Sequence, residues 1–228
     1  VAKGVSFEFG VDTGIYQTLA HELGHSLFGL EDLYIFLNST RPSVPDPTPA
    51  GPWDMMSQSN PEFFTWSKLL MGFLTDADFH CLTNQKYSVH YLANIDSIEQ
   101  NKAVFINLAP GHTLAIESRM NWNSLQGILV YEIDTKISHG DGPIKAQKSL
   151  LSKDGSIEIF GWKIMVLETS STGALVSVEK LNQSEPLASS TPSASPSPSP
   201  SASPSPSPTA DLNNQNSQEN LLEKPCQK

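Results

Sequence analysis

The spacing of apolar positions predicts helices in the first third of the chain. A first helix is expected over "GIYQTLAHELGHSLF", where Ile15, Leu19 and Leu23 recur every four residues and are predicted to face the core. A second, amphipathic helix is expected over "PEFFTWSKLLMGFL". A proline-rich loop separates these two segments.

The pattern changes to short apolar runs between about His80 and Lys180. "KAVFINLAPGHTLAIESR" holds two such runs divided by Pro110-Gly111, which predicts a hairpin. Four further runs follow, each bounded by Gly, Asp or Ser: "GILVYEID", "GSIEIF", "WKIMVLE" and "ALVSVEK". Short strands at this spacing favour an antiparallel sandwich or barrel over alternating β and α units.

The remainder of the chain lacks a pattern that could build a core. Residues 184–210 alternate Pro and Ser, which predicts an extended, solvated spacer, and the last residues are polar. We therefore predict an α+β fold class and three regions. These are a helical region at 1–78, a β-rich domain at 79–183 and a Ser/Pro-rich linker with a disordered tail at 184–228.

Composition narrows the classes of partner. The chain has 228 residues, 38% of them hydrophobic, which is enough for one or two small domains. Its net charge of −10 argues against nucleic acids and anionic membrane surfaces as partners. No apolar run approaches the ~20 residues of a membrane span. Cys81 and Cys226 are the only cysteines, and the sequence leaves open whether they form a disulfide.

The segment "HELGH" within the first predicted helix has the spacing of a metal site. His21 and His25 are four residues apart, so both imidazoles project from one face, one turn apart, and can reach one zinc ion. Glu22 neighbours the first histidine and is placed to take a proton from water rather than to bind the metal. H-E-x-x-H in a helix is typical of zinc metallopeptidases, although a surface helix can also hold these residues by chance.

A third ligand is expected shortly after this helix. Gly29 can adopt the left-handed conformation that ends a helix, and Leu30 is followed by two acids, Glu31 and Asp32. In zincins, the peptidases built around this helix, a third ligand about six residues past the second histidine completes the site. Both acids are candidates at this point.

Three stretches together resemble the immune inhibitor A-type secreted metallopeptidases. "HELGHSLFGLEDLY" is similar to their zinc segment, where Gly-Leu-x-Asp-x-Tyr follows H-E-x-x-H. "GPWDMMSQSNPEFFTWSKLLMGFL" is similar to their W-D-[LM]-M segment and the helix after it, and "TLAIESRMNWNSLQGILVYEIDT" is a weaker match to a β segment. The resemblance covers about residues 12–135. It implies that residues 1–78 are the C-terminal part of a zincin catalytic domain, followed by a small antiparallel β-sandwich-like domain.

The resemblance also bears on individual residues. Phe28 adds one residue to the family's usual spacing, so Glu31 occupies the usual ligand distance, whereas alignment on Gly-Leu-x-Asp-x-Tyr selects Asp32. The IgA-peptidase-like metallopeptidases resemble this chain in having the longer spacing. We therefore predict Asp32 as the third ligand, with Glu31 as the alternative. The resemblance further implies that Met56 forms an apolar floor beneath the histidine rings.

The expected function is that of a secreted or cell-surface zinc endopeptidase. Zinc is the expected cofactor, held by His21, His25 and Asp32, with Glu22 as general base and a protein or peptide as substrate. The tail is expected to attach the enzyme to a cell wall or surface. The alternative is a non-catalytic surface protein whose β domain binds a partner. About twenty residues precede His21, too few for the sheet that zincin domains place there, so we expect an N-terminally truncated domain.

Overall fold

The computed structural model describes residues 14–58, 62–83, 85–120, 126–181 and 226. Most of the described chain is strand, and the helices are concentrated before residue 71. The helical elements are α1 (Gly14–Phe28), the 3₁₀ helix η1 (Gly51–Trp53), α2 (Met55–Gln58) and α3 (Thr65–Leu70). The described residues contain no helix with the length and apolar character needed to cross a membrane.

Nine strands in the described residues form two sheets. The first sheet has the order β1-β3-β4-β5-β6 and the second has the order β2-β9-β8-β7. The strands are β1 (Phe79–Leu82), β2 (Tyr87–Ala93), β3 (Ala103–Ala109), β4 (His112–Met120), β5 (Gln126–Asp134), β6 (Ile144–Ala146), β7 (Ser156–Ile159), β8 (Trp162–Thr169) and β9 (Gly173–Lys180).

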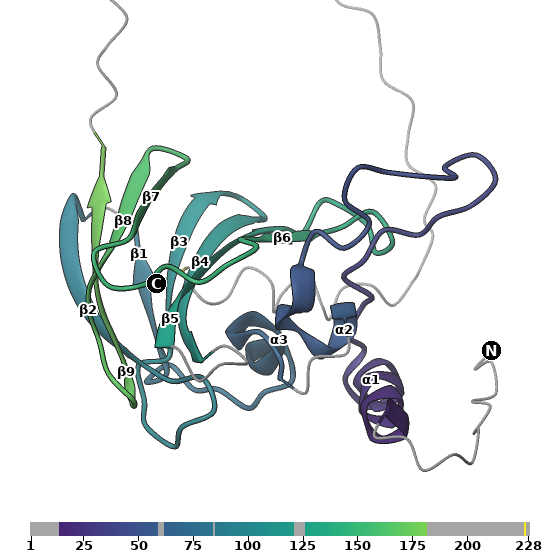
Figure 1. The fold of residues 1–228 in the computed structure, drawn as a ribbon, viewed down its shortest axis with the longest axis horizontal. Helices are drawn as coiled ribbons and strands as arrows, with labels where there is room; N and C mark the ends of the chain where they lie inside the picture. The colour runs from purple at the N-terminus through teal and green to yellow at the C-terminus, as the bar shows by residue number, and fades with distance from the viewer. Residues whose placement is uncertain (1–13, 59–61, 84, 121–125, 182–225, 227–228) are drawn as a thin grey trace, which may run out of the picture.

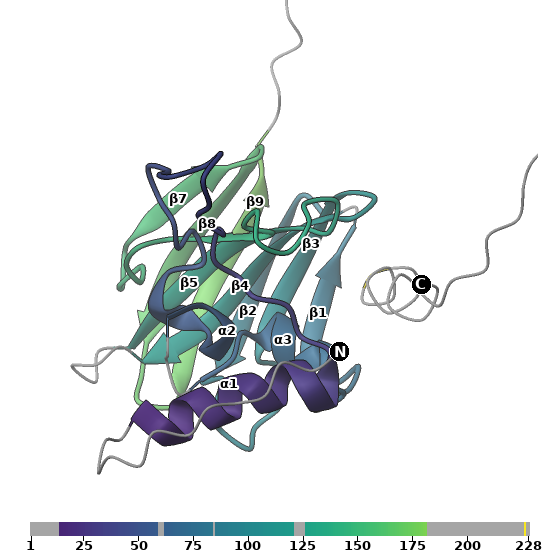
Figure 2. The same cartoon turned by 90° about the vertical axis from the view of Figure 1, so that its right-hand side faces the viewer.

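The molecule has three layers: the four-stranded sheet, the five-stranded sheet and the helices (Figure 1). Figure 2 shows α1 running across the helical side, next to α2 and α3. One apolar core lies between the sheets and includes Ile116, Ile128 and Val176. A second lies between the five-stranded sheet and the helical segments and includes Met56 and Phe105. The central strands of the five-stranded sheet are therefore buried on both faces, which explains their long apolar runs.

The predicted α+β class is confirmed, and so is the hairpin around Pro110-Gly111. β3 and β4 pair antiparallel on either side of this turn, and Gly111 has a φ of 76°, which glycine adopts without steric cost. One pairing departs from the expected antiparallel arrangement, because β1 pairs with β3 in parallel. The parallel pair is possible because β2, which lies between them in sequence, joins the other sheet.

The first predicted helix is confirmed in extent but not in orientation. α1 spans the 15 residues that the pattern indicated. However, Leu19 and Leu23 are 37% and 41% exposed and lie with Tyr16 and Leu27 on an outward stripe. The prediction that Leu19 and Leu23 face the core is wrong, because Gly24 and the histidines occupy the inward side. The second helix is shorter than expected, since α3 ends at Leu70.

The predicted domain boundary at residue 78 stays a prediction. Residues on both sides of it share one core, in which Leu33, Trp53 and Phe64 pack with Phe105 and Tyr131. The predicted linker and tail at 184–228 lie outside the described residues except for Cys226. That cysteine forms a disulfide with Cys81 on β1, with the two Cα atoms 5.3 Å apart.

Candidate metal centre

The two histidines of the motif lie one turn apart on the inward side of α1. Their ring centroids are 4.7 Å apart and their planes cross at 84°. The Nε2 atoms of His21 and His25 are 3.1 Å apart. This is the arrangement that a spacing of four residues in a helix predicts, with both rings turned to the same point.

The turn after α1 brings Asp32 to this point. Gly29 has a φ of 66°, and its N–H donates to the carbonyl of His25, which forms a left-handed helix cap. Asp32 Oδ1 then lies 3.1 Å from His21 Nε2 and 3.3 Å from His25 Nε2. The Asp32 side chain is 15% exposed, whereas Glu31 is exposed and outside this cluster.

The distances within this cluster fit a tetrahedral zinc ion. Donor atoms that each lie about 2.0–2.1 Å from a tetrahedral centre are about 3.3 Å apart. The three separations here are 3.1, 3.1 and 3.3 Å. Two imidazoles and one carboxylate also form a donor set suited to zinc rather than to calcium or magnesium, which prefer oxygen ligands.

Backbone carbonyls fix the orientation of both rings. His21 Nδ1 lies 2.9 Å from the carbonyl oxygen of Met55, and His25 Nδ1 lies 2.6 Å from that of Leu30. A carbonyl only accepts, so each Nδ1 carries the donated hydrogen and each neutral ring keeps a lone pair on Nε2. Asp32 Oδ1 is buried and accepts no hydrogen bond from another donor in the described chain. Three electron-rich atoms therefore converge where one cation would satisfy them all.

Met56 forms the floor under this part of α1. Its side chain is 1% exposed, and its Sδ lies 2.7 Å from the position that a Cβ on Gly24 would take. Gly24 lies between the two histidines in sequence, and its missing side chain lets the thioether approach the helix. The Met56 carbonyl accepts a hydrogen bond at 2.9 Å from the N–H of Leu33, the residue that follows Asp32. The structure thus packs Met56 against α1 at Gly24, and the implied floor beneath the histidine rings stays a prediction.

Glu22 and Tyr34 complete the polar surroundings of the cluster. Glu22 is half-buried and follows His21 on α1. Burial, followed by the charge and hydrogen bond of Asp32 and the charge of Glu22, raises the pKa of Tyr34 to about 12. Tyr34 therefore stays a neutral hydroxyl at physiological pH and can donate to the Asp32 carboxylate. From the sequence we expected Tyr34 to pack behind Asp32, but its hydroxyl was not identified as a donor to that carboxylate.

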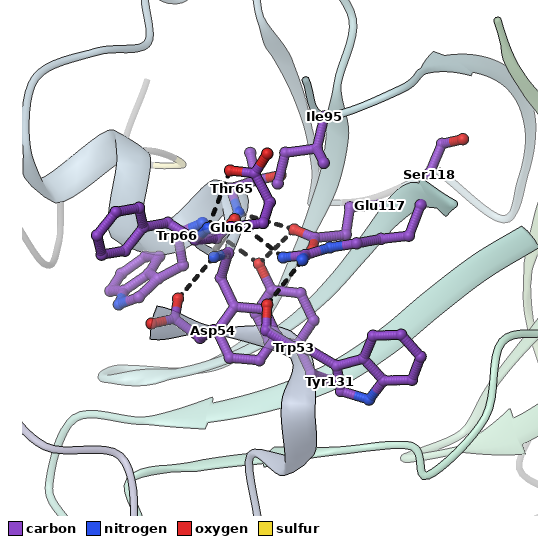
Figure 3. A network of polar contacts seen from close by, with 12 residues as sticks. Trp53, Asp54, Glu62, Thr65, Trp66, Ile95, Glu117, Ser118 and Tyr131 are labelled. Atoms are coloured by element: carbon purple, nitrogen blue, oxygen red, sulfur yellow. Dashed lines mark hydrogen bonds and ion pairs between the residues drawn. The ribbon is translucent and has the colours of Figure 1, made fainter. Parts of the chain in front are cut away.

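A buried polar network holds the segment that supplies Met55 and Met56 (Figure 3). The Asp54 carboxylate is fully buried and accepts from Met56 N at 2.7 Å, Phe64 N at 2.6 Å and Ser67 Oγ at 2.8 Å. Burial raises the pKa of Asp54, and these three donors oppose that shift. The network continues to β4 and β5, where Glu117 Oε2 accepts from the Tyr131 hydroxyl at 2.9 Å.

An apolar cavity of about 170 Å³ lies behind the Met56 floor. Its walls include Leu30, Leu33 and Met56 on the metal side and Ile133 and Ile144 on the sheet side. None of the three clustered residues lines it, so it is separate from the point where their donor atoms converge.

The other described histidines make different contacts. His112 Nε2 lies 2.8 Å from Glu132 Oε1, and His139 packs edge-on against Phe36. The His80 and His90 rings lie tilted to each other, with centroids 5.1 Å apart. Within the described ranges, His21, His25 and Asp32 form the one group of three candidate ligands close enough to share an ion.

Comparison with known proteins gives no further assignment. No protein-family model matches this chain, and searches of curated proteins and of solved structures find no match either.

Proposed function

We propose that this protein is a zinc-dependent endopeptidase that acts outside the cytosol. The observation that carries the proposal is the convergence of two oriented Nε2 lone pairs and an otherwise unpaired carboxylate oxygen at tetrahedral separations. The H-E-x-x-H motif adds an acid beside the first ligand, which a purely structural zinc site does not need.

His21, His25 and Asp32 would hold the metal, and Glu22 would perform the proton transfers. Bound zinc supplies a lowered pKa for water and polarisation of the substrate carbonyl. The Glu22 carboxylate would accept a proton from the attacking water and then donate it to the leaving amine. His21 and His25 keep their orientation through Met55 and Leu30 carbonyls, so the ligands need little rearrangement.

The disulfide and the tail agree with a location outside the cytosol. Disulfides persist in oxidising compartments, and Cys81–Cys226 is one in this structure. The Ser/Pro-rich composition of residues 184–210 suits a spacer on a secreted or surface-attached enzyme. The proposed substrate is a protein or peptide.

The proposal is tested first by metal content and then by hydrolysis. The parent protein should bind one zinc per chain after dialysis. In a form of the protein extended N-terminally, Glu22→Gln should retain that zinc while losing hydrolysis of casein, because the amide cannot accept the proton. His21→Ala is the matched control and should lose both zinc and hydrolysis. A parent without zinc, or a Glu22→Gln variant with parental hydrolysis, would contradict the proposal.

A second candidate is a non-catalytic surface protein whose β domain binds a partner. Tyr87, Val89 and Tyr91 on β2 favour it, because they alternate along the strand and are all exposed on the outer face of the sandwich. A parent protein that binds zinc but hydrolyses no peptide, and whose partner binding is lost in Tyr87→Ser/Tyr91→Ser, would select this alternative.

A further inference from the structure

We propose that Glu117 and Arg119 on β4 form a positioning pair for the metal site, acting through the segment Trp53–Met56. The inference rests on the proposed function, since it assigns these residues to the geometry of the zinc ligands. Neither residue touches the metal ligands directly.

The pair is fixed inside the protein at the β4 end. Glu117 is 0% exposed and Arg119 is 3% exposed. Arg119 Nε donates to Glu117 Oε1 at 2.6 Å, and its two remaining nitrogens donate to the carbonyls of Trp53 at 2.7 Å and Phe63 at 2.9 Å. The guanidinium therefore uses its fork geometry to bind the backbone on both sides of the helical connection.

Glu117 holds a second point on the same connection. Its Oε2 accepts from Thr65 N at 2.8 Å and from the Tyr131 hydroxyl (Figure 3). The pair therefore fixes Trp53 at one end and Phe63 and Thr65 at the other, and Asp54 links the two ends through Met56 N and Phe64 N.

The far end of the segment reaches the metal ligands in three ways. The Met55 carbonyl accepts from His21 Nδ1, and the Met56 carbonyl accepts from Leu33 N, one residue after Asp32. The Met56 side chain packs against α1 at Gly24. Trp53 is two residues from Met55, so only Asp54 intervenes between the Arg119 contact and the carbonyl that orients His21.

Metal binding is sensitive to displacements that a hydrogen-bonded segment can transmit. Zinc–ligand distances are held within about 0.2 Å, and groups that orient a ligand typically contribute 10–100-fold to metal affinity. A buried ion pair, by contrast, is often no more stabilising than apolar residues of the same volume. The pair is therefore better explained by the position it imposes on residues 53–56 than by its contribution to stability.

The test measures zinc affinity in variants that fold. Arg119→Lys keeps the charge but cannot reproduce the three-point contact, and Glu117→Gln/Arg119→Met removes both buried charges together. Val166→Ala is the control, because Val166 is fully buried in the core between the two sheets, whereas Trp53 and Met56 belong to the other core. Affinity is read by competition with a chromophoric chelator, and the ligand field is read from the cobalt-substituted spectrum.

Both test variants should bind zinc about tenfold or more weakly than the parent and show an altered cobalt spectrum. Val166→Ala should lower the melting temperature and leave both readouts parental. Folded test variants with parental affinity and spectrum would overturn the inference while leaving the proposed function in place. Absence of zinc binding in the parent would overturn both the inference and the proposed function. An equal loss of affinity in Val166→Ala would show that general destabilisation weakens zinc binding, and would overturn the inference.

Discussion

Both faces of the five-stranded sheet bury apolar side chains, but strand β4 adds a buried ion pair on the face toward the helical segments. On β4, Leu114 and Ile116 face the four-stranded sheet and lie in an apolar core. The alternate positions of the same strand face the helical segments and include Glu117 and Arg119, which are as deeply buried. One strand therefore contributes an apolar contact on one side and a hydrogen-bonded ion pair on the other.

The two kinds of buried group act differently: apolar burial contributes mainly to the free energy of unfolding, whereas the ion pair mainly fixes the position of its hydrogen-bond partners. Burial of an apolar side chain contributes about 1.5–3 kcal/mol and has little directional preference. A buried ion pair recovers its desolvation cost only when the hydrogen bonds have good geometry, so it penalises displacement of its partners. The face of β4 that packs on the four-stranded sheet can therefore tolerate small changes in side-chain shape. The face toward the helical segments fixes the backbone beside the candidate metal ligands.

The largest expected effect comes from removing one partner of the ion pair and leaving the other. Arg119→Met leaves the Glu117 carboxylate buried without its cation and should reduce the free energy of unfolding by about 3–5 kcal/mol. Urea denaturation measures this loss. Glu117→Gln/Arg119→Met should recover much of it, because neither charge of the pair remains. An equal loss in the single and double variants would show that the unpaired charge is not the cause.

Substitutions at the candidate metal ligands have the next largest expected effect, and they distinguish Asp32 from Glu31 as the third ligand. Asp32→Ala should weaken zinc binding by more than about a hundredfold, because a charged donor is lost from a three-ligand site. Glu31→Ala should bind zinc as the parent does, since Glu31 is exposed and outside the cluster. Isothermal titration measures both. The reverse order would make Glu31 the ligand.

A smaller effect is expected from Asp54, which accepts from donors on both oxygens. Asp54→Asn places an NH₂ group against at least one backbone N–H or the Ser67 hydroxyl. It should reduce the free energy of unfolding by about 1–3 kcal/mol, which thermal melting measures. Asp141→Asn is the control, because its pair with Arg41 is exposed and should contribute less than about 1 kcal/mol. Equal effects would mean that the buried acceptor role of Asp54 is unimportant.

The smallest expected effect comes from the apolar side of β4, where Ile116 packs toward the four-stranded sheet. Ile116→Val should reduce the free energy of unfolding by about 0.5–1.5 kcal/mol, because one buried methylene is lost. Its zinc affinity should equal that of the parent in the same titration. A clear loss of affinity would show that the two faces of β4 are not separate in this respect.

Local patterns predicted the elements whose signals lie close together in sequence. The bounds of α1 follow from periodicity and from Gly29, and the β3–β4 hairpin follows from Pro110-Gly111. Convergence of His21 and His25 follows from helix geometry alone. The pattern assigned no strand at the positions of β1, β2 and β6, of which β1 and β6 are only four and three residues long.

Features that depend on distant segments were not predictable in this way. The choice between Glu31 and Asp32 depends on how the turn after α1 packs. The spacing of the residues left both acids open, and only the resemblance selected Asp32. The inward charges of "AIESR" were seen only as part of a resemblance, although two charges in an otherwise apolar strand are a signal of a buried pair. The outward stripe of α1 was misjudged because periodicity shows that a face is apolar, not that a neighbour covers it.

The disulfide at the sheet edge makes part of the chain a covalent ring. Cys81 and Cys226 are 145 positions apart, so the ring encloses β2 to β9 and the Ser/Pro-rich tract. A single proteolytic cut in that tract would open the ring without separating the pieces, and the two fragments should migrate together in electrophoresis until a reductant is added. A cut in the tract alone would therefore not release the protein from a partner attached within residues 182–225. Release would also require reduction of the disulfide.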